Sequence, residues 1–253
     1  MNKSSAPPDT SLCLLQARHV SHVYSDGRVL ALSDVSISIR RGEYVAIVGP
    51  SGSGKSTLLN LLGALDQPTH GEVLFDERPL SAIRDLDSLR ARQIGFVFQS
   101  FHLLPTLTAL ENVQIPMFEG PNRSASERIR KAQELLTTVG LAHRVHHRPS
   151  QMSVGERQRT AIARALANDP PLILADEPTG NLDSHSGGEI LDLFDSLRRD
   201  RGVTLVVITH CSEVARRADR TITIRDGRIV LHNETGNELL HPNARLPVGL
   251  HST

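Results

Sequence analysis

The sequence predicts an α/β fold built on a mostly parallel sheet. Four short apolar runs have the composition of buried strands, at residues 44–48, 95–98, 171–176 and 203–209. Segments with helix-like patterns separate these runs. Alternation of strands and helices along a chain is typical of a parallel sheet covered by helices.

The N-terminal strands follow a different pattern. "VSISI" at 35–39 alternates apolar and polar residues, Arg41 and Gly42 form a predicted turn, and "YVAIV" at 44–48 is continuously apolar. Alternation indicates a strand with one buried face, whereas a continuous apolar run indicates a central strand. We therefore expect an antiparallel strand that leads into a buried central one. Near the end of the chain, "TITIRDGRIVLH" predicts two strands joined by a hairpin at Asp226 and Gly227.

Two helices are predicted from apolar spacing and capping residues. Between Ser124 and Gly140, the predicted core face comprises Ile129, Ala132, Leu135, Leu136 and Val139. A second helix should begin after Ser153, a plausible N-cap. Its predicted apolar face comprises Ala161, Ile162, Ala165 and Leu166.

Composition indicates a soluble globular protein and excludes few functions. The 28 Lys and Arg residues balance the 28 Asp and Glu residues, so charge favours neither nucleic acid nor an anionic membrane. We expect both cysteines, Cys13 and Cys211, to be free thiols. No apolar run has the length of a signal peptide or a membrane span, so neither export by that route nor direct membrane insertion is expected. Residues 1–11 are expected to form a disordered lead-in, and 233–253 carry no readable pattern.

A phosphate-binding loop is the clearest functional motif. "GPSGSGKST" at 49–57 matches G-x-x-x-x-G-K-[ST], follows a predicted strand and opens a predicted helix. Glycines let backbone N–H groups turn toward phosphate oxygens, Lys55 supplies a positive charge, and Ser56 can ligate Mg²⁺. The alternative, a chance glycine-rich turn, does not require the preceding strand.

Polar side chains follow the three other apolar runs. Asp176 and Glu177 are adjacent carboxylates that can divide two tasks, holding a metal and polarising an attacking water. His210 ends another run, where its side chain could face a γ-phosphate. The amide of Gln99 can reach a metal or a water. The alternatives are a solvated acidic turn, a structural histidine and an inert glutamine.

Four stretches together resemble the nucleotide-binding subunit of ABC transporters. They are "GPSGSGKST", "QMSVGERQR", "LILADEPTGNLDS" and "VVITH", and the resemblance covers about residues 14–232. "STLLNLLGALDQPTHGEV", "FVFQSFHLLPTLTALENV" and "ADEPTGNLDS" look most like the branch of lipoprotein-releasing, macrolide-exporting and cell-division ATPases. The resemblance implies a P-loop NTPase with a RecA-like parallel core sheet, an N-terminal antiparallel β subdomain and a helical signature subdomain. The implied ATPase domain spans 12–232, with the helical subdomain at about 100–165.

The resemblance also implies a role for each matching residue. Tyr24 would stack on adenine, Gln99 would join the metal site to the transporter contact, and Asp183 would lie in the D-loop that crosses to a partner subunit. Asp176 would bind Mg²⁺ with Ser56 and Gln99, while Glu177, His210 and Lys55 would be catalytic. ATP would be held by Tyr24 and by Gly49, Ser51, Gly52, Ser53, Gly54, Lys55, Ser56 and Thr57.

The loop "MSVGE" at 152–156 matches the family's signature loop. That loop binds the γ-phosphate of a nucleotide held by the other subunit, so two copies would sandwich ATP head to tail. A helix N-terminus at Ser153, Val154, Gly155 and Glu156 would favour an anion. Val154 replaces the family's first glycine. If this position needs a positive φ or close approach to phosphate, valine weakens binding; if its conformation is ordinary helix, valine is tolerable.

Other departures from the family pattern carry less weight. Cys211 stands where the family often has aspartate, and we expect a small buried apolar residue there. His143, His146 and His147 lack accompanying ligands in order, so we expect a solvated loop or helix end.

The resemblance implies a peripheral ATPase on the cytoplasmic face of the inner membrane that powers transmembrane permease subunits. The segment 99–117 is apolar enough to line the groove that receives a permease helix. Export or extraction of lipoproteins or lipids is the expected task. One alternative is a non-transporting module that regulates an envelope process. A nucleic-acid-associated ATPase is disfavoured, because the chain has one ATPase half, no heptads and no net positive charge.

Overall fold

A six-stranded, mostly parallel sheet forms the centre of the protein. The computed structural model describes residues 13–24 and 29–234, and its large sheet has the order β10-β9-β3-β8-β7-β6. Strands β9, β3, β8, β7 and β6 are parallel to one another, and β10 pairs antiparallel with β9. The strands are β3 (Tyr44–Val48), β6 (Ile94–Phe98), β7 (Leu172–Asp176), β8 (Thr204–Thr209), β9 (Arg220–Arg225) and β10 (Arg228–Glu234). The predicted α/β class and the C-terminal hairpin are confirmed.

A smaller antiparallel sheet lies beside the large one. Its order is β2-β1-β4-β5, with β1 (Cys13–Val23), β2 (Leu30–Arg40), β4 (His70–Phe75) and β5 (Arg78–Pro79). The predicted strand at 35–39 is the second half of β2, and its pairing with β1 is antiparallel. The turn at Arg41 and Gly42 then leads into the central strand β3, as expected.

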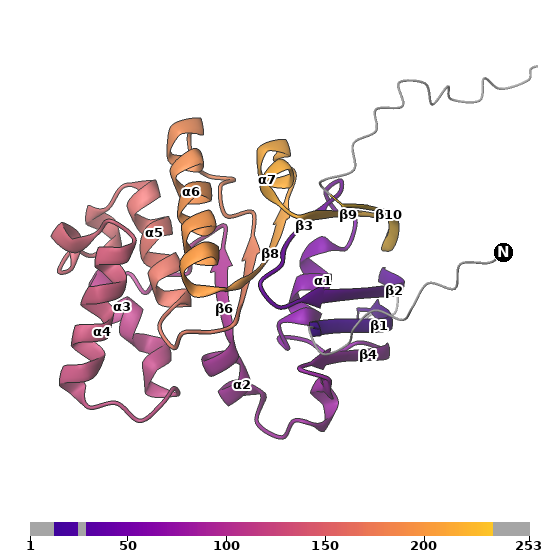
Figure 1. The fold of residues 1–253 in the computed structure, drawn as a ribbon, viewed down its shortest axis with the longest axis horizontal. Helices are drawn as coiled ribbons and strands as arrows, with labels where there is room; N and C mark the ends of the chain where they lie inside the picture. Colours follow the sequence, from indigo (N-terminus) through magenta and orange to yellow (C-terminus); the bar gives the residue numbers. More distant parts are fainter. Residues whose placement is uncertain (1–12, 25–28, 235–253) are drawn as a thin grey trace, which may run out of the picture.

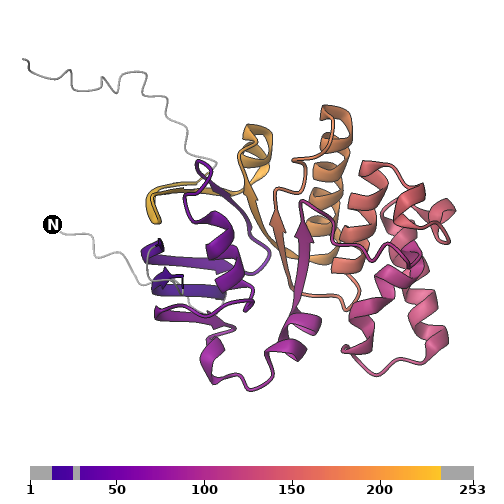
Figure 2. The same cartoon turned by 180° about the vertical axis from the view of Figure 1, so that it is seen from behind.

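Helices cover both faces of the large sheet. Figure 1 shows α3 (Ala109–Gln114), α4 (Ala125–Thr138) and α5 (Val154–Ala165) gathered beside α6 (Ser184–Arg201), on the side away from the antiparallel strands. Seen from behind in Figure 2, α1 (Lys55–Leu62) lies next to the antiparallel strands. The remaining α-helices of the described residues are α2 (Leu86–Gln93) and α7 (Ser212–Arg217). Short 3₁₀ turns occur at Leu80–Ala82, Ile115–Phe118, Ala142–Arg144 and Pro149–Gln151.

Side-chain alternation along β3 divides the core into two halves. Tyr44 and Ala46 face the helical side, where they join buried residues of α4, α5 and α6. Val45 and Ile47 face the opposite side and pack with buried leucines of α1 and with the antiparallel sheet. Successive strand residues point to opposite faces, so a fully buried strand must be apolar at every position. This is why the sequence of β3 is continuously apolar.

The two predicted helices are confirmed with one wrong core position. Ser124 caps α4 and accepts a hydrogen bond from the backbone N–H of Glu127, and Gly140 follows the helix with φ +76°. Leu135 and Leu136 are buried, but Ile129 is 41% exposed. Apolar spacing identifies a helix face but does not show where the neighbouring element ends, so the prediction for Ile129 was wrong.

The chain ends differ slightly from expectation. Strand β10 runs to Glu234, so residues 233 and 234 belong to the large sheet, although the sequence shows no pattern there. The expected disordered lead-in at 1–11 and the rest of the C-terminal tail lie outside the described residues. Within 13–24 and 29–234, no helix combines the length and the apolar character that crossing a bilayer requires.

Candidate active site

Four predicted site residues follow strands that end at one edge of the large sheet. The register pairs Phe98 with Asp176, Asp176 with Ile208, and Val48 with Thr209. The next residues along each strand are therefore Gln99, Glu177, Gly49 and His210, at neighbouring positions. The carboxyl edge of a parallel sheet is where α/β proteins form their ligand sites.

The phosphate-binding loop needs glycine for steric reasons. Gly54 caps α1 with φ +100°, and a Cβ atom there would lie 2.4 Å from the carbonyl oxygen of Ala31. A Cβ atom on Gly49 would lie 2.1 Å from the carbonyl oxygen of Ile224. Both contacts are far shorter than van der Waals distance. The loop thus packs against β2 and β9 in a way that only glycine permits.

Polar groups inside this loop are arranged for a ligand. The Nζ atom of Lys55 donates to the carbonyl oxygens of Gly49 (2.9 Å) and Pro50 (2.8 Å), which holds the ammonium group within the loop. The hydroxyl of Ser53 is buried and has no hydrogen-bond partner. A buried unpartnered hydroxyl in the same loop as an ammonium group suits an oxyanion such as phosphate, because buried polar groups are normally paired.

Tyr24 lies beside the phosphate loop and lines the same cleft. Its hydroxyl is 2.9 Å from Oγ1 of Thr57, and its ring meets the ring of His22 edge-on at 5.0 Å. The side chain is 43% exposed, so one part of the ring is open to solvent. The structure therefore places Tyr24 within reach of a nucleotide on the phosphate loop.

Oxygen donors gather beside the phosphate loop. The carboxyl of Asp176 shares a hydrogen bond with Ser56, and Gln99 lines the same cleft. Burial raises the pKa of Asp176, and the neighbouring charge of Glu177 raises it further, while the Ser56 hydrogen bond and Lys55 oppose that rise. A cation close to Asp176 would offset the cost of burying this carboxylate.

Glu177 and His210 are joined by a direct contact. An oxygen of the Glu177 carboxylate is 2.9 Å from Nδ1 of His210. Glu177 has φ +45°, an uncommon conformation for a non-glycine residue. Its backbone N–H donates to Ile208 (2.9 Å), and its carbonyl accepts from Gly180 (3.0 Å). The backbone is thus held on both sides while the side chain faces the cleft.

A cleft of about 910 Å³ connects these groups. Sequence reasoning placed its phosphate and carboxylate walls but missed the wall formed by Val29, Leu30, Ala31, Asp226 and Gly227. The backbone N–H of Gly227 donates to the carbonyl of Ser53 at 3.0 Å, so the C-terminal hairpin supports the phosphate loop. Asp226 and Gly227 were identifiable only as a turn, because nothing local in the sequence shows what a hairpin packs against.

The predicted signature loop lies apart from this cleft. Ser153 caps α5: its hydroxyl accepts from the N–H of Glu156 (3.2 Å), and the Glu156 carboxylate accepts from the N–H of Ser153 (2.8 Å). Val154 is the first residue of the helix, is not among the residues with positive φ, and is 37% exposed. Its conformation is thus ordinary helix, which resolves the open question about backbone strain at this position. A Cβ atom on Gly155 would lie 3.8 Å from the side chain of Ser186, which is an ordinary van der Waals distance.

The remaining predicted residues have local structural partners. Asp183 caps α6 by accepting from the N–H (3.0 Å) and the hydroxyl (2.7 Å) of Ser186. Cys211 is a free, half-buried thiol packed against the helical core, and Cys13 is also free.

The histidines His143, His146 and His147 lie around a 3₁₀ turn. The Nε2 atom of His147 is 3.2 Å from Arg144. Within residues 13–24 and 29–234, no three His, Cys, Asp or Glu side chains are grouped to hold a metal ion.

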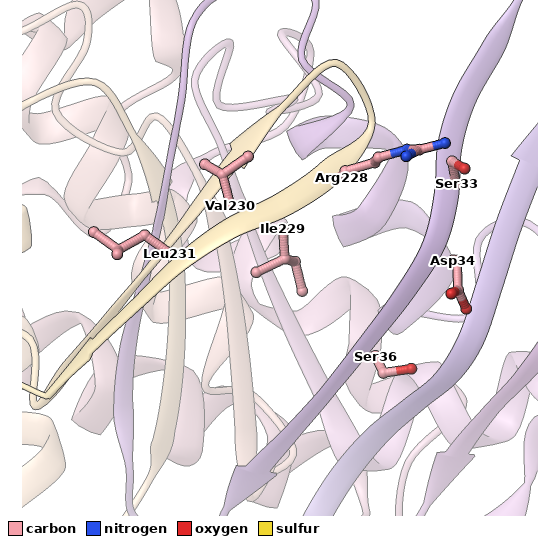
Figure 3. Close-up of a pocket in the computed structure, with 7 residues that line it drawn as sticks. All are labelled: Ser33, Asp34, Ser36, Arg228, Ile229, Val230 and Leu231. Atoms are coloured by element: carbon pink, nitrogen blue, oxygen red, sulfur yellow. The ribbon is translucent and has the colours of Figure 1, made fainter. Parts of the chain in front are cut away.

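A separate hollow of about 560 Å³ lies between the free edges of the two sheets. Figure 3 shows Arg228 reaching toward Ser33 of β2, with Val230 and Leu231 further along β10. None of the predicted site residues lines this hollow, so it is distinct from the cleft described above.

Comparisons with other proteins agree with the site. A family model described as ABC transporter matches residues 32–180. An uncharacterized ABC transporter ATP-binding protein of Thermotoga maritima is 57% identical over 204 residues, 80% of this chain and 86% of that protein.

Solved structures of ATP-binding cassettes share the fold. The dimeric structure of MJ0796, a bacterial ABC transporter cassette, is 44% identical with a TM-score of 0.82, covering 88% of this chain and all of that one. A dimeric post-hydrolysis state of the same cassette, bound to ADP and phosphate, matches equally well. CbiO1 of Clostridium perfringens, part of the ABC transporter complex cbiONQ, is 28% identical with a TM-score of 0.80, covering 88% of this chain and 89% of that one.

The family match, the relative at 57% identity and the cleft geometry lead to one conclusion: this chain belongs to the ABC transporter family, as an ATP-binding subunit that hydrolyses ATP.

Proposed function

We propose that two copies of this chain sandwich ATP head to tail and drive a membrane complex. Each ATP would lie between the phosphate loop of one copy and Ser153 of the other. The contact between Glu177 and His210, at 2.9 Å in the cleft lined by the phosphate loop, carries the hydrolytic part of the proposal. It brings a base and a second proton-handling group to the place where a γ-phosphate would end.

Each residue has a distinct part in hydrolysis. Lys55 neutralises phosphate charge, and the amides of Gly52, Gly54 and their neighbours bind phosphate oxygens. Glu177 accepts a proton from the attacking water, and His210 keeps that carboxylate aligned with the γ-phosphate. Ser153 of the partner copy would add a hydroxyl and a helix N-terminus to the same phosphate. Tyr24 would bind the adenine end.

The residues beside the loop also fit Mg²⁺. Ser56, Gln99 and Asp176 would hold it through a hydroxyl, an amide carbonyl and a carboxylate, which are the hard oxygen ligands that this cation prefers. The half-buried Asp176, with its raised pKa, is the group whose charged form such a cation would favour. When bound, the cation would neutralise charge that develops on the β- and γ-phosphates.

A permease helix would dock on the side of the large sheet opposite the C-terminal hairpin. A groove of about 430 Å³ there is lined by Phe98, His102, Ile115 and Pro116, together with Arg164 of α5 and Asn168 just after that helix. These residues overlap the segment 99–117 that the sequence singles out. We place the subunit at the cytoplasmic face of the inner membrane for this reason.

We further propose that the complex exports a substrate or extracts lipoproteins or lipids. The support is the likeness of the stretches after the phosphate loop and Gln99 to the lipoprotein-releasing and macrolide-exporting branch. In cells that produce Glu177→Gln protein, the extracted lipid or lipoprotein should accumulate in the inner membrane. A defect in an envelope enzyme without such accumulation would instead favour the regulatory alternative.

Hydrolysis measured against protein concentration tests the sandwich itself. The parent should show Mg²⁺-dependent activity that rises cooperatively with concentration, while Glu177→Gln should be inactive. A silent parent, with activity gained in Val154→Gly, would contradict a homodimer with two working signature loops.

A further inference from the structure

Three non-glycine residues with positive φ lie in the two loops that carry Gln99 and Glu177. Phe101 and His102 both have positive φ, at +60° and +46°, two and three residues after Gln99. Glu177 has φ +45°. Strained non-glycine conformations cost about 1–3 kcal/mol each and persist only where surrounding contacts hold them. Those contacts are therefore part of what positions the site.

Arg164 holds the first of these loops. It projects from α5, and its guanidinium donates to the carbonyl of Phe101 at 2.7 Å and also to the carbonyl of His102. Both of these contacts are to backbone carbonyls. Among the described carboxylates none forms an ion pair with Arg164. Arg157 adds a second contact from the same helix, with its guanidinium 5.4 Å from the centre of the Phe101 ring.

Gln158 holds the second loop. Its side chain is fully buried, and Nε2 donates to the carbonyl of Pro178, the residue after Glu177, at 2.7 Å. The Oε1 atom of Gln158 has no hydrogen-bond partner. A buried amide with one unsatisfied atom is costly to the fold. The single bond to Pro178 is therefore what this side chain contributes.

We propose that Gln158 and Arg164 are positioning residues of the ATPase, which lock the loops of Glu177 and Gln99 to the helix that begins at Ser153. The inference rests on the roles proposed above for Glu177, Gln99 and Ser153. Helix α5 then links two sites, because its first turn would meet the nucleotide of the partner copy while its later turns hold the cis carboxylate and amide. A shift of α5 would therefore alter the geometry of both nucleotide sites.

Steady-state kinetics of the full chain test this assignment. Gln158→Met and Arg164→Met should each lower kcat about tenfold to hundredfold, because small displacements of catalytic groups are costly in rate. KM for ATP and the affinity for ADP should stay within about twofold, since the phosphate loop is untouched. Arg164→Lys keeps a charged donor and should recover part of kcat.

Arg159→Met is the matched control. Arg159 lies on the same helix and also binds a carbonyl, that of Val139 at 3.3 Å, together with Glu189 at 2.7 Å, but it contacts neither loop. Its removal should lower thermal stability and leave kcat unchanged. Gln158→Met removes the unsatisfied Oε1 atom but leaves the carbonyl of Pro178 without its donor, so the two changes oppose each other and the melting temperature should stay close to the parent while the rate falls.

Two outcomes would overturn the inference. One is a fall in kcat that follows loss of stability equally in Arg159→Met and in the two positioning variants. The other is a weaker ATP affinity at unchanged kcat. If Glu177→Gln is inactive while Gln158→Met and Arg164→Met keep the parent kcat, this inference alone fails. If Glu177→Gln keeps the parent kcat, the proposed base is wrong and the inference falls with it.

Discussion

Two helices of this chain begin at loops proposed to bind ATP phosphates, one in its own copy and one in the partner copy, and they begin in opposite ways. Helix α1 starts after Gly54, with φ +100° and no side-chain cap, and its first turn contains no acidic residue. Helix α5 starts after Ser153, whose hydroxyl and backbone are both bonded to Glu156. The first helix end leaves its N–H groups for a ligand, whereas the second satisfies its own end.

This difference explains why glycine is required in one loop and replaceable in the other. Any side chain at Gly54 would collide with the backbone of β2, because the loop is pressed between the sheets. Val154 occupies a helical conformation with a partly exposed side chain, so nothing within the subunit opposes it. The need for glycine follows from tertiary packing as well as from the ligand.

Gly54→Ala should have the largest effect. The new Cβ atom would lie 2.4 Å from the carbonyl of Ala31 in a conformation unfavourable for alanine. We expect the free energy of unfolding to fall by about 1–3 kcal/mol and ATP binding to be lost, measured by thermal melting and nucleotide titration. Gly188→Ala, in α6 with open space around it, should not destabilise the protein. Equal behaviour of the two variants would show that the loop is not sterically confined.

Ser153→Ala should have the second-largest effect. Loss of the helix cap should lower the free energy of unfolding by about 0.5–2 kcal/mol, and loss of the trans hydroxyl should lower kcat about hundredfold. Ser124→Ala is the control, because Ser124 caps α4 with the same reciprocal bonds to Glu127. It should lose similar stability without losing kcat. A rate loss shared by both variants would argue against a phosphate contact at Ser153.

Acid should destabilise α5 through Glu156. Hydrogen bonding from the backbone N–H of Ser153 lowers the pKa of Glu156, and Arg144 contributes to the decrease. The folded-state pKa lies below the ordinary value of about 4.3, so this stabilisation is present above that value and is lost as pH falls through the lowered pKa. Urea unfolding from pH 7 to pH 3 should show a shallower decline in Glu156→Gln than in the parent. An unchanged pH dependence would mean that this carboxylate does not stabilise the fold.

Val154→Gly should have the smallest effect. The activation free energy for ATP hydrolysis in this variant should differ from that of the parent by less than about 1 kcal/mol, which corresponds to about fivefold in rate. Stability should drop by a few tenths of a kcal/mol, because glycine is a poorer helix former than valine. Hydrolysis assays of both proteins at equal concentration provide the measurement. A large gain of rate in the glycine variant would show that the valine side chain obstructs the partner's nucleotide.

Much of the site was predictable because its residues follow strands. Asp176 ends a buried strand, Glu177 and His210 come directly after buried strands, and parallel strands bring such positions to one edge of the sheet. The phosphate loop is a contiguous motif whose spacing alone identifies it. Helix caps at Ser124 and Ser153 were predictable for the same reason, since a cap depends on residues only three positions apart.

Other features depend on residues that are distant in the sequence. The clash that requires Gly54 comes from Ala31, and the hairpin at Gly227 supports the phosphate loop through Ser53. Gln158 reaches Pro178 and Arg164 reaches Phe101, contacts that no periodic pattern records. The exposure of Ile129 likewise depends on where neighbouring elements end.

The sequence by itself determined the α/β class, the phosphate loop, the order of the strand-end residues and the resemblance to the ABC family. These depend on local periodicity and on contiguous motifs, which side-chain burial and backbone preferences dictate within a few residues. Only the tertiary structure decided that Val154 is an ordinary helical residue, that Glu177 bonds to His210, and that α5 contacts the loops that follow Gln99 and Glu177. The physical reason is that packing brings these groups together across long stretches of chain, where local preference has no influence.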